Sequence, residues 1–396
     1  MRATILLFFA AVAAPRPGLA QQAQVNLEPA PHRNTDNLTP YGASVISPEV
    51  ATDRRITFRL KAPAASSVLL APSPLTLALG ERKPVPFTKG DGGVWTLTVG
   101  PVKPNIYVYR LQVDGVSVAD PNNTLSGFGN QPAFSEVVVP GEGPAYYDAR
   151  PVPHGAVTRH IYHSDVTKGE REIYVYTPPG YAAGRRYPVL YLLGGSGELA
   201  SGWLLYGRLD LILDNLIAEG KAQPMIVAMP NNQVLHRSHP QHAELTFTTF
   251  EAELRRQIVP FVDRHYRTRA ERRGRALAGL SMGGRHTQTT GFACLDLFSS
   301  FGVLSAGDVD TEKTSATFFA TPGVAKKVDY LLVGLGSHEQ NPMGNLRPVE
   351  ERSLALRDAL ARHKIPHEYY AGGDGGHDWG TWRHLLHAKL LPGLWR

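Results

Sequence analysis

The stretch ALAGLSMGG, residues 276–284, carries the strongest structural signal in this chain of 396 residues. Its first part, 276–280, is apolar without alternation, which is typical of a strand buried on both faces of a parallel sheet. A helical pattern follows through residues 287–292. The glycines that flank Ser281 permit a strained strand-to-helix turn, which exposes a serine hydroxyl at the end of the sheet. The stretch therefore predicts a parallel sheet that presents Ser281 as a candidate nucleophile.

The same alternation of strand and helix extends over the C-terminal part of the chain. Short apolar runs are separated by stretches whose apolar residues recur at helical spacing, which is typical of helices on both faces of a sheet. The apolar runs lie at 188–193, 225–229, 301–304 and 330–335, and helices are expected at 209–217, 250–262, 349–363 and after Trp379. We therefore predict the α/β class, with a doubly wound and mostly parallel sheet, over residues 159–396.

The preceding part of the chain has a different pattern. Between 46 and 140, short alternating segments are separated by Gly and Pro, and Asp114-Gly115 supplies a hairpin turn. This pattern predicts a small antiparallel β-sandwich. The Pro- and Gly-rich residues 141–158 are expected to form a linker.

Residues 1–20 have the features of a secretory signal peptide. A positive residue, Arg2, precedes an apolar segment at 5–14 and the small-residue sequence GLA, after which we expect cleavage. Residues 21–45 are expected to form an extended leader. No later stretch approaches the ~20 apolar residues that a membrane helix needs, so no membrane insertion is expected. The mature protein is therefore expected to be secreted or periplasmic.

Composition argues against several classes of function. With 42% hydrophobic and 19% charged residues, the chain has a globular composition. The single cysteine, Cys294, excludes a disulfide framework and a zinc cluster built from cysteines, and we expect it in the core. The net charge of +6 comes from scattered Lys and Arg, so nucleic-acid binding is not expected.

Catalysis by a serine hydroxyl requires a general base and a carboxylate that orients this base. In an α/β hydrolase the chain order is serine, acid, histidine. His377 fits the base, because it lies in a glycine-rich loop before the last expected helix. Glu339 fits the acid, because it follows the apolar run at 330–335. Asp308 and Asp310 remain alternatives for the acid, since they follow the preceding run.

The same mechanism requires backbone N–H groups that stabilise an oxyanion. We expect one from Met282, next to the nucleophile, and one from Ser196 in the glycine-rich loop at 194–197. This loop lacks the spacing of a phosphate- or dinucleotide-binding motif, so no cofactor is expected.

A metal site is not expected either. His236, His239 and His242 recur at every third residue, but Pro240 prevents a helix there, so the three side chains are not expected to share one helix face.

Residues around the predicted site are candidates for contact with a substrate. Loops that follow strands commonly surround an active site, and indole rings stack on aromatic groups and sugars. The candidates are Gly195, Trp203, His236, Trp379 and Trp382. For the three tryptophans, packing in the core is the alternative.

Four segments occur in order along residues 159–396. They are YPVLYLL at 187–193, LDNLIAEG at 213–220, GLSMGG at 279–284 and GHDW at 376–379. Together they resemble carbohydrate esterase family 1, the feruloyl and acetylxylan esterases related to the esterase D and antigen 85 fold. The resemblance implies an α/β-hydrolase domain with a triad of Ser281, Glu339 and His377, and ester substrates attached to polysaccharides. Residues 46–140 are similar to the early-set β-sandwich of carbohydrate-binding module family 48.

Two residues depart from the family pattern. Relatives usually have, in place of Gly194, a histidine that braces the oxyanion loop, and they usually have Asp in place of Glu339. Glutamate performs the same task in other α/β hydrolases. These departures therefore concern rate and substrate range more than the type of reaction.

The sequence as a whole indicates an exported serine esterase that needs no cofactor. Its expected substrates are feruloyl or acetyl esters of plant cell-wall xylan, cleaved through an acyl-enzyme. Two other functions remain open: hydrolysis of another small ester such as a ferric siderophore, and carbohydrate binding by a degenerate hydrolase domain. The intact Ser281 and His377 argue against the second.

Overall fold

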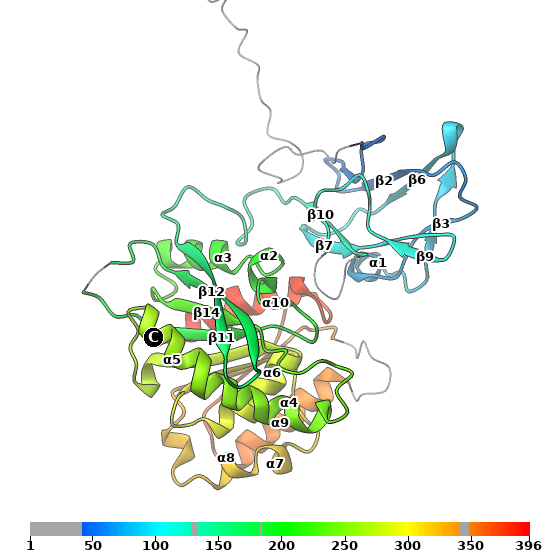
Figure 1. Cartoon of the computed structure of the whole chain (residues 1–396). Coiled ribbons are helices and arrows are strands. Elements are labelled where there is room, and N and C mark those ends of the chain that lie inside the picture. The colour runs from blue at the N-terminus through cyan, green and yellow to red at the C-terminus, as the bar shows by residue number, and fades with distance from the viewer. Residues whose placement is uncertain (1–41, 128–132, 183, 340–347) are drawn as a thin grey trace, which may run out of the picture. The chain divides into compact units, whose positions relative to one another are not determined.

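Figure 1 shows the computed structural model, which describes residues 42–127, 133–182, 184–339 and 348–396. The predicted signal peptide and most of the predicted leader lie outside the described residues. Within the described ranges, no helix has the length and apolar character needed to cross a membrane.

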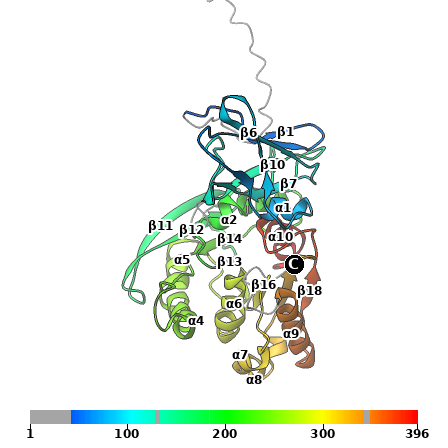
Figure 2. The ribbon, with the colours of Figure 1, turned by 90° about the vertical axis from the view of Figure 1, so that its right-hand side faces the viewer.

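Eight strands from the described part of the chain form one sheet in the order β11-β12-β14-β13-β15-β16-β17-β18. Figure 2 shows this succession from the β11–β12 hairpin at one edge to β18 at the other. From β14 to β18 all neighbours are parallel, whereas β12 is antiparallel to β11 and β14. The strands are β11 Ala156–Ser164, β12 Gly169–Thr177, β13 Val189–Leu193, β14 Ile226–Pro230, β15 Arg275–Leu280, β16 Ser300–Leu304, β17 Tyr330–Leu335 and β18 Glu368–Ala371. The predicted α/β class is confirmed, and β13 to β17 coincide with the apolar runs.

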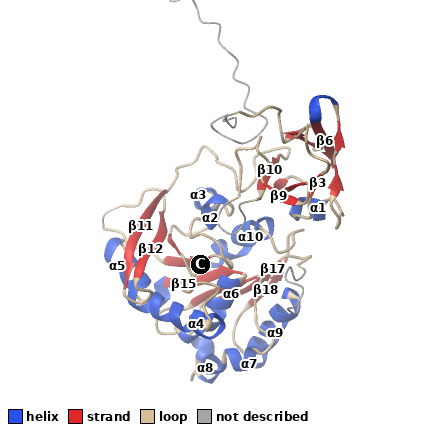
Figure 3. Ribbon diagram, turned by 45° about the vertical axis from the view of Figure 1, so that its right-hand side comes forward, coloured by secondary structure: helices blue, strands red, loops and turns tan. Residues whose placement is uncertain are grey.

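Helices cover both faces of this sheet, as Figure 3 shows in blue around the red strands. Side chains of β13 point alternately to the two faces: Tyr191 and Leu193 belong to one buried cluster, and Leu190 and Leu192 to the other. The first cluster includes residues of α4 (His242–Glu253), the π-helical turn Leu254–Ile258, α5 (Val259–His265) and α9 (Val349–Arg362); the second includes residues of α3 (Leu209–Ala218) and α10 (Trp379–Leu385). The strands of the central sheet are therefore covered on both sides, which explains why their sequences are apolar throughout.

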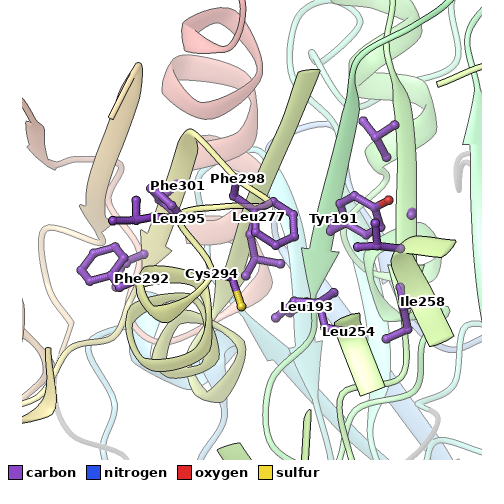
Figure 4. Packing of buried hydrophobic residues seen from close by; sticks show 14 of the residues in the cluster. Tyr191, Leu193, Leu254, Ile258, Leu277, Phe292, Cys294, Leu295, Phe298 and Phe301 are labelled. Atoms are coloured by element: carbon purple, nitrogen blue, oxygen red, sulfur yellow. The ribbon is translucent and has the colours of Figure 1, made fainter. Parts of the chain in front are cut away.

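Figure 4 shows part of the first cluster, where Cys294 lies among apolar side chains that include Leu277 and Phe298. The thiol has no exposed surface, and burial raises its pKa to about 12. The prediction of a core cysteine is confirmed, and the raised pKa makes this thiol a poor nucleophile.

Antiparallel strands between Glu49 and Val139 form the small β-sandwich. They pair in the orders β1-β2-β6-β5, β4-β3-β8-β9 and β10-β7 around a core that contains Phe58 and Tyr109. The bounds are β1 Glu49–Val50, β2 Ile56–Lys61, β3 Val68–Leu70, α1 Pro74–Ala78, β4 Val85–Pro86, β5 Thr88–Lys89, β6 Val94–Val99, β7 Asn105–Tyr109, β8 Leu111–Val113, β9 Val116–Val118 and β10 Ser135–Val139. The antiparallel sandwich is confirmed, and Asp114-Gly115 makes the hairpin turn between β8 and β9.

The β11–β12 hairpin differs from the sequence-based expectation. β11 starts at Ala156, so the end of the predicted linker pairs in the large sheet, before the predicted domain start at 159. Most of β11 is exposed because it is an edge strand. Such a strand does not need the continuous apolar run that identifies the central strands, and therefore its sequence gives a weaker signal.

Candidate active site

Ser281 lies on the turn between β15 and α6 (Met282–His286). Its backbone has φ 51° and ψ −114°, a strained conformation for a residue with a side chain. Its N–H donates to the Leu304 carbonyl at 2.9 Å. At Gly283, a Cβ atom would lie 2.6 Å from the carbonyl oxygen of Gly194, so only glycine fits there. The glycine after the nucleophile therefore allows this turn to approach the loop that follows β13.

His377 lies in the loop between β18 and α10, with its Nε2 2.9 Å from the Oγ of Ser281. The next residue, Asp378, caps α10. Its Oδ1 accepts the N–H of Thr381 at 3.1 Å, and its Oδ2 accepts the N–H of Gly376 at 3.1 Å. This cap holds the backbone on both sides of the histidine and thereby positions the imidazole ring.

The carboxylate of Glu339 contacts the other ring nitrogen. Its Oε1 is 2.5 Å from Nδ1 of His377, and its Oε2 accepts the N–H of Gly336 at 3.0 Å. The Glu339 side chain has no exposed surface. Asp308, an alternative acid, instead forms an ion pair with Arg285 at 3.5 Å. The structure therefore places Ser281, His377 and Glu339 in one hydrogen-bonded series. Their order along the chain, serine, acid and histidine, is the expected one.

Three side chains hold the glycine-rich loop after β13 by donating to successive backbone carbonyls. Trp203 Nε1 donates to Leu193 at 3.0 Å, Asn232 Nδ2 to Gly194 at 3.0 Å and Gln233 Nε2 to Gly195 at 2.9 Å. The next residue, Ser196, lines the same cavity as Ser281 and Met282. The N–H of Met282 belongs to the first turn of α6, where N–H groups lack an intrahelical acceptor. Both predicted oxyanion donors are thus located around the serine.

Asn232 and Gln233 are not among the residues predicted from the sequence. The available signal is their position, because the sequence NNQ at 231–233 directly follows β14. Residues beyond the carboxyl ends of parallel strands surround the ligand crevice of open α/β sheets. Asn232 is also almost fully buried, which distinguishes it from an ordinary loop amide.

Glu198 occupies the space beside Gly194, the position at which the family resemblance implies a histidine. A Cβ atom on Gly194 would lie 3.3 Å from the Oε2 of Glu198. This oxygen also accepts the N–H of Gly195 at 2.9 Å. Burial raises the pKa of Glu198 to about 7. In this chain, Glu198 and Asn232 therefore hold the loop that lacks the histidine.

The three tryptophans predicted to contact substrate pack against one another instead. Trp379 makes edge-to-face contacts with Trp203 and Trp382, with ring centroids 5.2 and 5.1 Å apart. All three side chains are buried, and Trp382 Nε1 donates to the Oγ of Ser305 at 2.9 Å. The edge of Trp382 also contacts His377, at a centroid distance of 5.2 Å. The structure corrects the substrate-binding prediction for these residues, because their rings are buried and pack against one another and against His377.

A cavity of about 410 Å³ opens at the serine. Its lining comes from the loops and helices after several parallel strands: Ser196, Arg237, His242, Ala243, Thr246, Phe247, Ser281, Met282, Arg285, Ser305, Ala306, Arg352 and His377. From the histidine run, His242 is in this lining, whereas His236 is exposed and its Nδ1 lies 2.7 Å from the Oγ of Ser238. Gly195, another predicted contact, has its N–H bonded to Glu198. His236 and Gly195 are not among these lining residues, and their contacts with a substrate stay predictions.

The family profile described as "Putative esterase" matches residues 164–392. The chain belongs to this esterase family. The matched residues include the complete series of serine, glutamate and histidine described above.

The name of a similar protein agrees with this family assignment. A protein from Xylanibacter ruminicola named endo-1,4-beta-xylanase/feruloyl esterase is 33% identical over 358 residues, which cover 88% of this chain and 46% of the relative. This chain therefore spans less than half the length of that relative. The resemblance to the feruloyl esterase group predicted from the sequence segments is confirmed.

Solved structures extend the comparison to the fold. A feruloyl esterase module from Clostridium thermocellum is 26% identical, with a TM-score of 0.52, covering 62% of this chain and 90% of the module. Enterochelin esterase from Shigella flexneri is 18% identical, with a TM-score of 0.65, covering 88% of this chain and 94% of that protein. The similarity to enterochelin esterase concerns the fold alone. Because it covers 88% of this chain, it extends beyond the hydrolase domain into the residues before the β11–β12 hairpin.

Proposed function

We propose that this esterase is a serine carboxylic ester hydrolase that acts on feruloyl or acetyl esters of plant cell-wall xylan. The observation that carries the proposal is the hydrogen-bonded series in which His377 lies 2.9 Å from Ser281 and 2.5 Å from Glu339. Nucleophile, base and orienting acid in this order are the requirement for acyl transfer through a covalent intermediate.

In the proposed mechanism, the Oγ of Ser281 attacks the ester carbonyl while Nε2 of His377 takes its proton. The backbone N–H groups of Met282 and Ser196 stabilise the oxyanion, and Glu339 stabilises the imidazolium through Nδ1. His377 then gives the proton to the departing alcohol, which leaves an acyl group on Ser281. Water, deprotonated by the same histidine, attacks this acyl-enzyme and releases the acid.

The substrate class is supported by the relatives. The name of the Xylanibacter ruminicola protein combines xylanase and feruloyl esterase activities. The cavity of about 410 Å³ is within the range of about 300–1,000 Å³ that is usual for sites of small molecules. We also propose export of the protein, because residues 1–20 have the pattern of a signal peptide. Glycan binding by the β-sandwich stays a prediction.

The variant S281A tests the nucleophile. It should abolish hydrolysis of methyl ferulate and p-nitrophenyl acetate, because residual catalysis without the nucleophile is orders of magnitude slower. A fluorophosphonate should label the wild type and not S281A, which also separates an esterase from a carbohydrate-binding protein with an inactive hydrolase domain. The matched control is S238A, at an exposed serine. Turnover by a folded S281A at the wild-type rate would exclude the assignment.

A second candidate function is hydrolysis of a siderophore ester of the enterochelin type. The fold similarity to enterochelin esterase covers 88% of this chain, including the β-sandwich, whereas the feruloyl esterase module covers 62%. A panel of feruloylated arabinoxylan, acetylated xylan and a tri-catecholate ester distinguishes the two. The primary proposal requires the highest kcat/KM on one of the two xylan esters.

A further inference from the structure

Three arginines line the cavity beside Ser281: Arg237, Arg285 and Arg352. They come from different parts of the hydrolase domain, namely the loop after β14, helix α6 and helix α9. Arg285 lies one helical turn beyond the nucleophile, and its backbone N–H donates to the backbone carbonyl of Ser281 at 3.1 Å. Because these guanidinium groups converge from separate segments, the fold concentrates positive charge at the reaction centre.

The acids near this cluster do not neutralise it. Asp308 meets Arg285 at 3.5 Å, and the carboxylate of Glu339 is hydrogen-bonded to His377. Within the described ranges, Arg237 and Arg352 form no ion pair with an acid. Three guanidinium groups therefore share two nearby acids, Asp308 and Glu339, and Glu339 is already hydrogen-bonded to His377.

The surroundings of the Arg352 side chain are the second observation that points to an anionic ligand in this cavity. This side chain is half-buried, and its Nε has no hydrogen-bond partner among the described residues. Burial and the neighbouring Arg285 both lower the pKa of Arg352, whereas Asp308 and Glu339 act in the opposite direction. The guanidinium geometry matches a carboxylate, which can accept two parallel N–H bonds.

We propose that this cavity selects esters that carry a carboxylate, held by Arg352 together with Arg285 and Arg237. The inference rests on the proposed esterase function and narrows its substrate class. The carboxylate has two possible sources, the acyl group or an acidic sugar close to the ester on the polysaccharide. Phe247 lies under the guanidinium of Arg285, 5.2 Å from the ring centroid, and keeps this cation beside the nucleophile.

Two matched substrate pairs test the proposal and distinguish the sources. p-Nitrophenyl butyrate and p-nitrophenyl hemiglutarate differ by a carboxylate on the acyl side, and feruloylated xylo-oligosaccharides with and without a uronate branch differ on the sugar side. The readout is the ratio of kcat/KM for the charged and the neutral member of each pair. The wild type should prefer the charged member of at least one pair by about tenfold or more, and salt should reduce this preference.

The variant R352Q should lower that ratio by about tenfold to hundredfold, mainly through KM, because it removes a charge-assisted contact. R237Q, in an exposed loop, should also lower the ratio. It replaces R352Q as the test variant if R352Q does not fold. R256Q is the control, because it removes the same charge from an exposed position on the π-helical turn Leu254–Ile258. The ratio should be the same in R256Q and the wild type.

The outcomes separate the inference from the proposed function. Hydrolysis of both members of each pair at equal kcat/KM, or ratios that R352Q and R237Q leave unchanged, would overturn the carboxylate site while the esterase function stands. Failure of the wild type to hydrolyse any of the four esters would overturn both.

Discussion

Two glutamates near His377 show how the surroundings of a carboxyl group determine its task. Glu339 faces Nδ1 of the histidine and is held by the N–H of Gly336. Glu198 instead lies beside the glycine-rich loop, where burial raises its pKa to about 7. The carboxylate of Glu339 is suited to orienting an imidazolium. The carboxyl of Glu198 is suited to accepting an N–H from the loop, and it is partly protonated near neutral pH.

The variant E339Q should lower kcat on p-nitrophenyl acetate by about 10³- to 10⁴-fold, because an amide does not stabilise the imidazolium and favours the wrong tautomer of His377. E339D should retain more activity, since it preserves the carboxylate. D310N serves as the control at an alternative acid. A loss in D310N or D308N that exceeds the loss in E339Q would contradict the role proposed for Glu339.

The variant E198Q should change how stability depends on pH. The carboxyl of Glu198 ionises at its ordinary pKa of 4.5 in the unfolded chain and at about 7 in the folded protein. Between these values the folded protein binds more protons, so the free energy of unfolding of the wild type falls as pH rises, by about 3 kcal/mol in total. The glutamine keeps an oxygen acceptor for the Gly195 N–H and does not ionise.

Urea unfolding measures this effect. The stability of E198Q relative to the wild type should increase between about pH 5 and about pH 8, because only the wild type loses the protonated carboxyl over this interval. An equal difference at the two pH values would show that the ionisation of Glu198 is not linked to folding.

At the level of elements, the loop after β13 is positioned by the segment after β14. The two strands are parallel neighbours, so their carboxyl ends meet at one edge of the sheet. Asn232 and Gln233 reach from one loop to the carbonyls of the other. This arrangement adds support from the segment after the adjacent strand to the hydrogen bond that Glu198 accepts within the loop.

The variant N232A should reduce kcat by about tenfold to hundredfold with a smaller effect on KM, because the oxyanion donors lose their fixed position. The matched control is N215A, since Asn215 is a buried amide that donates to the carbonyls of Tyr146 and Asp148, away from the cavity. Both variants should lose about 1–3 kcal/mol of stability. An equal kcat in the two variants would exclude a positioning role for Asn232.

On the scale of the whole molecule, the described residues, which begin at residue 42, belong to one compact unit. Ile106 of β7 and Val138 of β10 belong to the same buried cluster as Trp379 of the hydrolase domain. Arg383 of α10 has no exposed surface, and its guanidinium donates to the carbonyl of Ile106 at 3.0 Å. The β-sandwich therefore shares part of the core on which the catalytic loops rest.

The variant R383M should lower the free energy of unfolding by about 3 kcal/mol, because it removes three hydrogen bonds donated by a buried guanidinium. The acceptors are the Oδ1 of Asn105 and the carbonyls of Ile106 and Tyr206. Chemical denaturation of the full chain measures the loss, and R256M is the control at an exposed arginine. A loss below about 0.5 kcal/mol, as at ordinary surface positions, would contradict this account.

Much of the hydrolase domain was predictable because its central strands are buried on both faces. The apolar runs of β13 to β17 are local features, and so is the glycine pattern around Ser281. The edge strand β11 was missed, since an exposed strand needs no apolar run. Chain order makes Glu339 a candidate acid beside Asp308 and Asp310, but its distance from His377 is a property of two loops brought together by the sheet.

By itself, the sequence determined the fold class, the esterase family and the chain order of serine, acid and histidine, because these depend on periodicity, glycine spacing and local motifs. Only the tertiary structure decided that the tryptophans pack beneath the site, that Asn232 and Glu198 brace the loop at Gly194, and that Arg237, Arg285 and Arg352 converge on one cavity. The physical reason is that burial and contact between side chains depend on how distant strands are ordered in the sheet, and no local pattern contains that order.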